Sequence, residues 1–277
     1  MGKNDHLKDK LFFVKQNNYN ISKDEINQLV QEMLENIGSI DSELRDQLIY
    51  TTFYMWIMGE RFTSVELRGL LQTTLSENFL FHKLGEINSI SVFKRSFSVL
   101  IVALILNINQ KLNFLCVEEL FEVYEKLIDY FKKEKDLRGY DRNYGWAHSV
   151  AHAADAFDEL VKYKEIDNDK LINILHLFKE KIQINHYAYI NGEDERLVIA
   201  VYSLLKRNTL DSIDIIHWID ELIHYPKKNI YPEDDIILTN IKSFLRSLYF
   251  RVKNDEKINE ISSYIVKALD EIDVYKN

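Results

Sequence analysis

Helix-breaking residues are almost absent from this chain, which has two prolines and eight glycines among its 277 residues. Proline removes a backbone N–H donor and glycine costs conformational entropy, so both interrupt helices. The chain is instead rich in Leu, Ile, Glu and Lys, and its hydrophobic content of 46% is enough for a sizeable core. The sequence therefore predicts an all-α protein.

Helix starts are marked by local signals. Ser22 with Glu25, and Thr63 with Glu66, have the spacing of capping boxes, and Asp41, Asp167 and Asp211 are further N-cap candidates. The predicted helices cover residues 7–15, 23–37, 42–58, 63–81, 89–108, 117–133, 144–163, 168–184, 193–206, 211–225, 234–252 and 256–274. The connections are short, so consecutive helices should pack as antiparallel neighbours.

Helix pairs begin near residues 22, 63, 116, 168 and 211. These steps are close to the roughly 40–50 residues of HEAT-like repeats. We expect a HEAT-like α-solenoid of antiparallel helix pairs, with an irregular helical bundle as the alternative. Residues 1–277 should form a single helical array, in which 1–20 are a leading helix with a polar segment and 226–235 are a loop with both prolines.

Composition narrows the functional classes. The net charge of −9 disfavours nucleic-acid binding, because backbone phosphates require a basic surface. The single cysteine, Cys116, cannot form a disulfide within the chain, which favours a cytoplasmic protein. The longest apolar run, Phe97–Leu106, is shorter than the roughly 20 residues needed to cross a bilayer. We therefore expect no membrane contact.

The stretch from Glu134 to Leu160 is the strongest candidate for chemistry. If it is wound as a helix from about Tyr144, Trp146 and the aliphatic residues form one face, and His148, His152 and Asp155 lie on the opposite face. Two histidines four residues apart can bind one metal. A possible divalent metal would thus use His148, His152 and Asp155 with a further ligand from elsewhere. Ser149 occupies the place of the general base of zinc proteases, which argues against that chemistry.

Two other interpretations of this stretch stay open. In one, the helix start and the side chains of Arg138 and Arg142 bind an anion or a small molecule in a groove rimmed by Tyr144 and Trp146. In the other, the polar face is only solvated, or it bridges to a neighbouring helix. Asp136 is expected to pair with an arginine of this loop.

Secondary candidates lie elsewhere in the chain. His217, Glu221 and His224 share one face of the helix expected over 211–225. Glu195 and Arg196 could act as an acid/base and its counter-ion. Arg95 has few local acidic partners and is expected to pair with a carboxylate of a neighbouring helix, for which Asp136 is a candidate.

Several segments carry a family resemblance. The runs EKDLRGY and GWAHSVAHAADAFDEL, together with LRDQLIYTTFYMWI, VFKRSFSVL and GEDERLVIAVYSLL, resemble the uncharacterised bacterial family catalogued as domain of unknown function 2785. The resemblance covers about residues 22–205. It implies an all-α, HEAT-like bacterial protein and implies no activity.

The function expected from these residues is binding of an unknown protein or small-molecule ligand through a polar groove centred on the GWAHSVAHAAD segment. The alternative is a metal-dependent hydrolase that uses His148, His152 and Asp155. The sequence leaves open whether the protein is an enzyme, and it identifies no cofactor.

Overall fold

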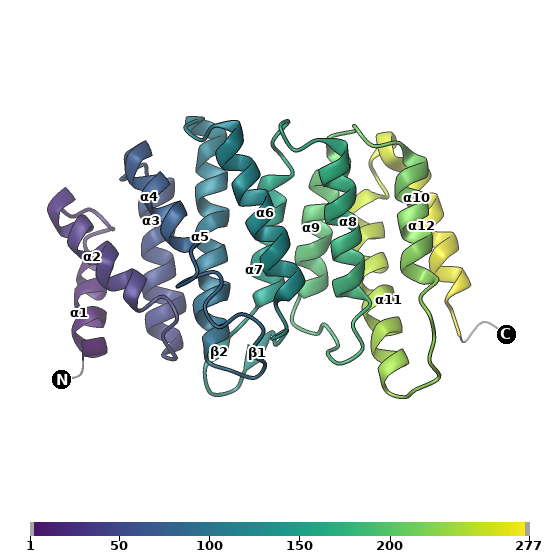
Figure 1. The fold of residues 1–277 in the computed structure, drawn as a ribbon, viewed down its shortest axis with the longest axis horizontal. Coiled ribbons are helices and arrows are strands. Elements are labelled where there is room, and N and C mark those ends of the chain that lie inside the picture. Colours follow the sequence, from purple (N-terminus) through teal and green to yellow (C-terminus); the bar gives the residue numbers. More distant parts are fainter. Residues whose placement is uncertain (1–2, 275–277) are drawn as a thin grey trace. The chain divides into compact units, whose positions relative to one another are not determined.

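The computed structural model describes residues 3–274, which form twelve α-helices, one π-helix, one short 3₁₀-helix and one two-stranded hairpin. The prediction of an all-α protein is confirmed (Figure 1). Contacts within the chain divide it into two compact units, Met1–Ala156 (unit 1) and Phe157–Asn277 (unit 2). The prediction of one continuous array stays a prediction.

Unit 1 is built on α5, which packs against α3 and α4, while α1 packs against α3 and η1. Its elements are α1 (Lys3–Gln16), α2 (Lys23–Glu35), the π-helix η1 (Glu43–Tyr50), α3 (Thr51–Met58), α4 (Ser64–Thr74), α5 (Ser91–Leu112), α6 (Val117–Lys133), β1 (Tyr140–Asp141), β2 (Gly145–Trp146) and most of α7 (Ser149–Leu160).

Unit 2 arranges its helices in two rows, because α10 packs against both α8 and α12, and α9 packs against α11 (Figure 1). Its elements are the end of α7, then α8 (Asn168–Ile182), α9 (Glu193–Lys206), α10 (Ser212–Ile223), α11 (Glu233–Val252), the 3₁₀-helix η2 (Glu256–Ile258) and α12 (Asn259–Glu271).

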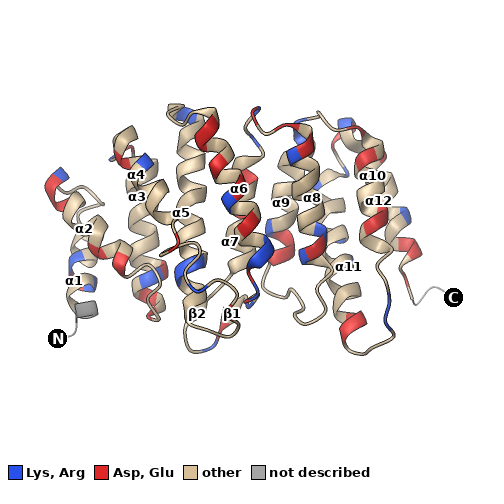
Figure 2. Cartoon of the chain, in the orientation of Figure 1, with Lys and Arg blue, Asp and Glu red and all other residues tan. Residues whose placement is uncertain are grey.

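Helix α5 is the centre of the unit 1 core. It is long and apolar enough to cross a bilayer, but the apolar part is mostly buried inside the protein, as in the core helix of a soluble protein. Its charged residues, Lys94, Arg95 and Lys111, lie near its ends, so its middle is uncharged in Figure 2. Phe93, Val99 and Ile105 are among its fully buried side chains.

The helix boundaries follow the local signals where these are strong. Both predicted capping boxes form, at Ser22 and at Thr63. Several other boundaries differ from prediction, and the helix expected over 42–58 forms as the π-helix η1 followed by α3. The helix expected over 63–81 ends at Thr74, because the Leu80 N–H returns to the Thr74 carbonyl (3.1 Å) and closes the chain into turns. The helix expected over 256–274 begins as a separate 3₁₀ turn, where the Asp255 carboxylate accepts from the Lys257 N–H.

Candidate functional site

A β-hairpin stands where the sequence predicted the start of a helix. Tyr140 pairs with Trp146 and Asp141 with Gly145 in antiparallel register, and α7 begins only at Ser149. The expected helix start at Tyr144 is therefore wrong. Gly145 has φ +79°, and a Cβ there would lie 2.8 Å from the Ser42 Cβ. The left-handed backbone conformation of Gly145 and its close contact with Ser42 turn the chain at this point, so the helix starts later.

Aromatic rings form a row that runs from the hairpin into the core. Tyr140 lies edge-on to Trp146 (4.7 Å between centroids), and Trp146 stacks on His148 (4.4 Å). His148 then contacts His152 (5.6 Å), and His152 lies edge-on to Phe97 of α5 (5.1 Å). Trp146 was expected on the apolar face of a helix, but it is 40% exposed, and Tyr140 is 50% exposed.

Arg138 connects the hairpin to the preceding chain, and each of its three side-chain nitrogens donates a hydrogen bond. It donates to both oxygens of Asp136 (2.8 and 2.7 Å), to Asp141 (2.7 Å) and to the Ser89 carbonyl (2.8 Å). The expected pairing of Asp136 with an arginine of this loop is confirmed. The acidic partners and the resulting hydrogen bonds raise the pKa of Arg138. Of the two arginines expected to bind an anion, Arg142 is the exposed one.

His152 is a buried residue, so the open alternative of an only solvated polar face on α7 does not hold at this position. Its Nδ1 lies 3.2 Å from the Ser96 carbonyl of α5. Ala151, Ala153 and Ala154 are also buried, and such small side chains permit a close approach of a neighbouring element. Asp155 is partly buried. His152 therefore fits the other open alternative, in which this face of α7 bridges to a neighbouring helix, here α5.

The expected metal site lacks a complete ligand set. Among the residues that the structure describes, no three His, Cys, Asp or Glu side chains form a group that could hold a metal ion. A metal at His148, His152 and Asp155, and the hydrolase chemistry that depends on it, stays a prediction without structural support. The ring nitrogen of His152 that faces Ser96 already has a partner.

Arg45 anchors the hairpin through a side-chain hydrogen bond, and the sequence analysis did not identify it as a site residue. It is fully buried in η1 and donates to the Ser39 carbonyl (2.6 Å) and, across nearly a hundred residues, to the Tyr144 carbonyl (2.8 Å). Its guanidinium lies over the Phe93 ring (4.2 Å). Its ion-pair partner is Asp46 (2.7 Å). π-Helical turns are frequent at functional sites, and the π-helix η1 carries Arg45, whose side chain reaches the hairpin.

Asp46 should make the stability of unit 1 depend on pH. Burial raises the pKa of Asp46 to about 6, although Arg45 opposes the shift. An acid whose pKa is higher in the folded state than its ordinary 3.8 stabilises the fold below that value and loses the contribution as pH rises through about 6. We expect the stability of Asp46→Asn, relative to the natural protein, to rise by up to about 3 kcal/mol from about pH 4 to about pH 7.

Urea denaturation across this pH range measures the difference directly. The attraction between ionised Asp46 and Arg45 is already included in the folded-state pKa of about 6, so the asparagine, which does not titrate, adds only a pH-independent difference and leaves the slope unchanged. A relative stability that stays constant with pH would contradict a partly buried carboxyl with a raised pKa at position 46.

Arg95 pairs, as expected, with a carboxylate of a neighbouring helix, but this is Glu134 at the C-terminal end of α6 and not the candidate Asp136. It forms a two-pronged ion pair with Glu134, with Nε–Oε2 at 2.6 Å and Nη2–Oε1 at 2.9 Å, and both side chains are buried. Asp136, which was one candidate for this role, is paired with Arg138. The carboxylate of Glu134 also accepts the backbone N–H groups of Lys135 and Asp136, so the pair fixes the segment that leads into the hairpin.

The secondary candidates in unit 2 are only partly brought together. Glu195 pairs across the surface with Arg251 of α11 (3.3 Å), and Arg196 is exposed beside it. His224, the C-cap residue of α10, faces Glu271 of α12 (2.9 Å), and its contact with the Asp220 carbonyl, followed by that with Glu271, raises its pKa. None of these residues lies at the hairpin, which belongs to unit 1.

Glu221 is the centre of a basic cluster in unit 2. Its carboxylate contacts Lys179 (2.6 Å) and His176 (3.4 Å) of α8 and His217 (3.4 Å) of α10. The Lys179 ammonium lowers the pKa of Glu221. An open cavity of about 520 Å³ lies beside these residues. The i, i+4 spacing predicted the His217–Glu221 contact, whereas His176 and Lys179 come from another helix and gave no signal.

The comparisons with known proteins agree with the resemblance seen in the sequence. No curated protein and no solved structure matches the chain. A family model does match the chain. Its match begins after α4, later than the resemblance at about residue 22, and it extends through most of α11, beyond the end of the resemblance at about residue 205. The model of the family described as "Protein of unknown function (DUF2785)" matches residues 80–250, more than half of the chain, and the chain belongs to this family.

Proposed function

We propose that the protein is a helical binding module that engages a partner protein through the hairpin surface, defined as Tyr140, Arg142, Trp146 and His148. The observation that carries the proposal is the exposure of two large aromatic side chains, at 50% and 40%, on one two-stranded hairpin. Trp, Tyr and Arg are the residue types that most often dominate binding energy at protein interfaces.

Rigidity of the hairpin supports the same function. Ordering flexible loops and side chains on binding costs free energy, so a surface that is already ordered binds more tightly. Arg138 ties the hairpin to Asp136 and Ser89, and Arg45 ties it to η1. Stacking between Trp146 and His148 holds the indole in place.

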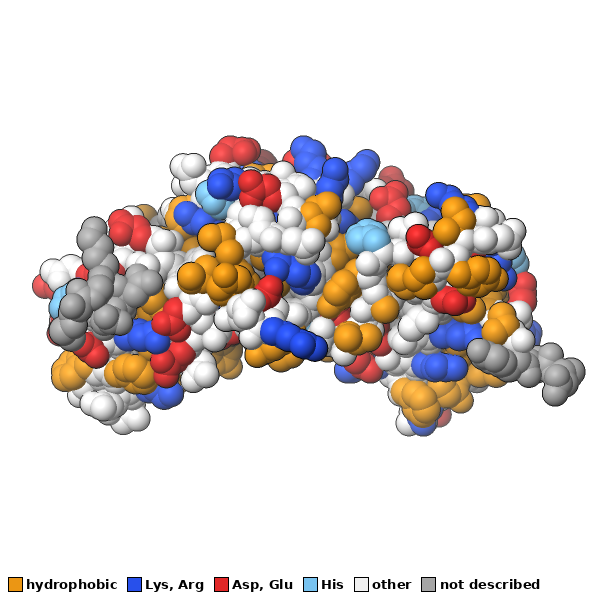
Figure 3. All heavy atoms as spheres, turned by 90° about the horizontal axis from the view of Figure 1, so that it is seen from below, with side chains coloured by type: hydrophobic (Ala, Val, Ile, Leu, Met, Phe, Trp, Pro, Cys, Tyr) orange, Lys and Arg blue, Asp and Glu red, His pale blue; other side chains and the backbone are white. Residues whose placement is uncertain are grey.

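The partner should present a flat apolar group beside a carboxylate. The aromatic rings of the hairpin surface supply apolar contact area, and Arg142 supplies an exposed cation that can form a two-pronged bond with a carboxylate. Asp141, the acidic neighbour on the hairpin, is paired with Arg138, which it shares with Asp136. Figure 3 views the protein from below Figure 1, the side at which the hairpin of unit 1 lies.

Photo-crosslinking tests the proposal. We expect a photoreactive phenylalanine at position 140 to capture a discrete protein in extracts of cells that express the natural protein. Trp146→Ala should abolish this adduct, while its cost in stability stays below about 1 kcal/mol because the indole is partly exposed. Arg142→Ala should weaken capture.

Tyr54 of α3 offers a matched control, because it is 44% exposed and lies outside the hairpin. The photoreactive group at position 54 should capture no such adduct, and Tyr54→Ala should not affect capture from position 140. No adduct from position 140, or an adduct that persists in Trp146→Ala, would contradict a binding role for the hairpin surface.

We further propose that the helices stack as HEAT-like pairs. Support comes from unit 2, where α8, α10 and α12 form one row and α9 and α11 form another, as repeated helix pairs require. A bacterial, cytoplasmic protein fits the family resemblance and the single, unpaired cysteine Cys116.

A further inference from the structure

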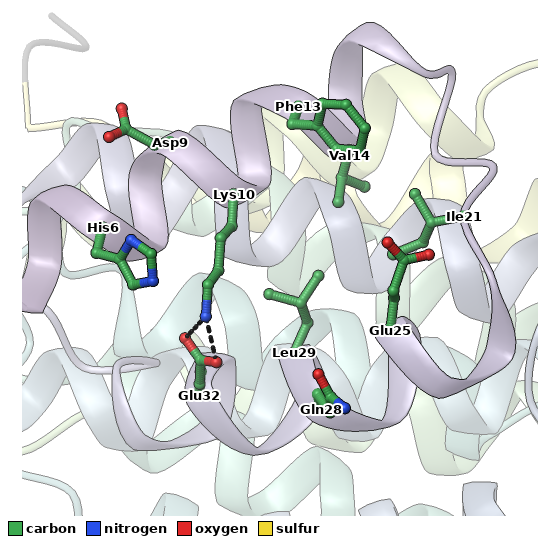
Figure 4. Close-up of a pocket in the computed structure, with 10 residues that line it drawn as sticks. All are labelled: His6, Asp9, Lys10, Phe13, Val14, Ile21, Glu25, Gln28, Leu29 and Glu32. Carbon is green, nitrogen blue, oxygen red and sulfur yellow. Dashed lines mark hydrogen bonds and ion pairs between the residues drawn. The ribbon is translucent and has the colours of Figure 1, made fainter.

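A cavity of about 380 Å³ lies between α1 and α2 in unit 1, far along the chain from the hairpin surface. Its base is apolar, with Val14 of α1 and Leu29 of α2 pointing into it and Ile21 at one end (Figure 4). Phe13 forms one wall and is 56% exposed. We call this cavity the α1–α2 groove.

The rim of the groove is acidic. Asp9, Glu25 and Glu32 lie along it, and among the side chains that the structure describes Lys10 is the one lysine or arginine that lines it. Lys10 donates to both carboxylate oxygens of Glu32 (2.7 and 3.0 Å), so these two charges offset each other. Asp9 and Glu25 remain as negative charges on opposite helices (Figure 4). Hydrogen bonds from Ser22 lower the pKa of Glu25 and keep it ionised.

We propose that the α1–α2 groove binds an amphipathic helix of a partner protein, with an apolar side chain inserted over Val14 and Leu29 and Lys or Arg residues against Asp9 and Glu25. An apolar floor between two helices, bordered by a rim of net acidic charge, is an arrangement that can receive an amphipathic helix laid into the groove. Opposite charges at the rim favour the encounter and select the partner.

The exposed wall distinguishes a helix from a small molecule. A small molecule held in the cavity leaves the outer face of Phe13 in water, whereas a helix lying across α1 and α2 covers it. Charge distinguishes a foreign helix from a second copy of the chain. Each copy has a net charge of −9, so two copies repel each other, most strongly where the contact itself is acidic.

The probes are two synthetic helical peptides with the same leucine face, one with lysine and one with glutamate on the polar face. We expect the lysine peptide to bind the full-length protein by calorimetry at low salt, with an affinity that falls as salt is added. The glutamate peptide should not bind. Equal binding of both peptides, or none by the lysine peptide, would overturn the proposal.

Neighbouring phenylalanines give a matched pair of variants. Phe13→Ser should weaken binding of the lysine peptide by about tenfold or more, as for a central interface aromatic. Phe12→Ser removes the same side chain from a residue that is 38% exposed and lies outside the groove, and it should change affinity by less than about twofold. Equal losses in the two variants would place the peptide elsewhere.

A second pair tests the charge. Asp9→Lys should weaken binding of the lysine peptide more than Asp24→Lys, which makes the same change on the exposed surface outside the groove. Equal effects would mean that the peptide responds only to net charge. Sedimentation of the natural protein completes the test: self-association that Phe13→Ser abolishes would identify a second copy as the occupant and overturn the proposal.

Discussion

Glu134→Gln is expected to lower the free energy of unfolding by about 3–5 kcal/mol, because it leaves the buried guanidinium of Arg95 without a counter-charge. Both side chains are buried, and two hydrogen bonds of 2.6 and 2.9 Å join them. The same carboxylate also accepts two backbone N–H groups of the chain that leads into the hairpin. Urea denaturation at neutral pH measures the loss.

Two control variants separate the buried charge from a general effect of losing an ion pair. Glu195→Gln breaks the exposed pair with Arg251 and should cost less than about 1 kcal/mol. The double variant Arg95→Met, Glu134→Leu removes both charges and should recover part of the loss, since no uncompensated ion then stays buried. A loss in Glu134→Gln as small as that in Glu195→Gln would contradict the buried pair.

The fold could be predicted from the sequence where helix signals are local. The helices expected over 117–133 and 193–206 have these same bounds in the structure, and the capping boxes at Ser22 and Thr63 form as predicted. Each depends on residues within one turn of the helix end. The arrangement of the two units is not contained in such signals.

The hairpin was missed because its stability comes from distant residues. Tyr144 to Leu160 has helical periodicity, but Arg45 holds the Tyr144 carbonyl and Gly145 packs against Ser42. One local signal could have indicated a turn: Asp141-Arg142-Asn143-Tyr144-Gly145 has turn-forming residues followed by glycine, a pattern typical of three-residue hairpin loops. The left-handed φ of +47° at His148 had no such signal.

The candidate site was predicted in its location but not in the roles of its residues. Arg138 and His152, chosen as ligand-binding residues, have buried or bridging partners in the structure. Trp146 was chosen as a groove residue, and its side chain does reach the surface. A sequence shows which side chains are chemically capable, whereas the residues that restrain them, here Arg45 and Glu134, lie on other helices.

Arg45→Met is expected to have the other large effect, a loss of about 3–5 kcal/mol in the free energy of unfolding near neutral pH. Methionine fills part of the volume above the Phe93 and Phe97 rings. It cannot replace the donors to the Ser39 and Tyr144 carbonyls, and it leaves the partly buried Asp46 without its cation. Urea denaturation measures the loss.

The loss should be smaller at about pH 5 than at about pH 7.5, because the Asp46 carboxyl with a raised pKa is then protonated and needs no counter-charge. Hydrogen exchange should also quicken in residues 139–147 before the rest of unit 1, since Arg45 joins the hairpin to η1. Arg142→Met is the matched control: it removes an exposed arginine of the hairpin and should change stability by less than about 0.5 kcal/mol. If Arg45→Met left hairpin exchange unchanged, the hairpin surface would owe its rigidity to Arg138 alone.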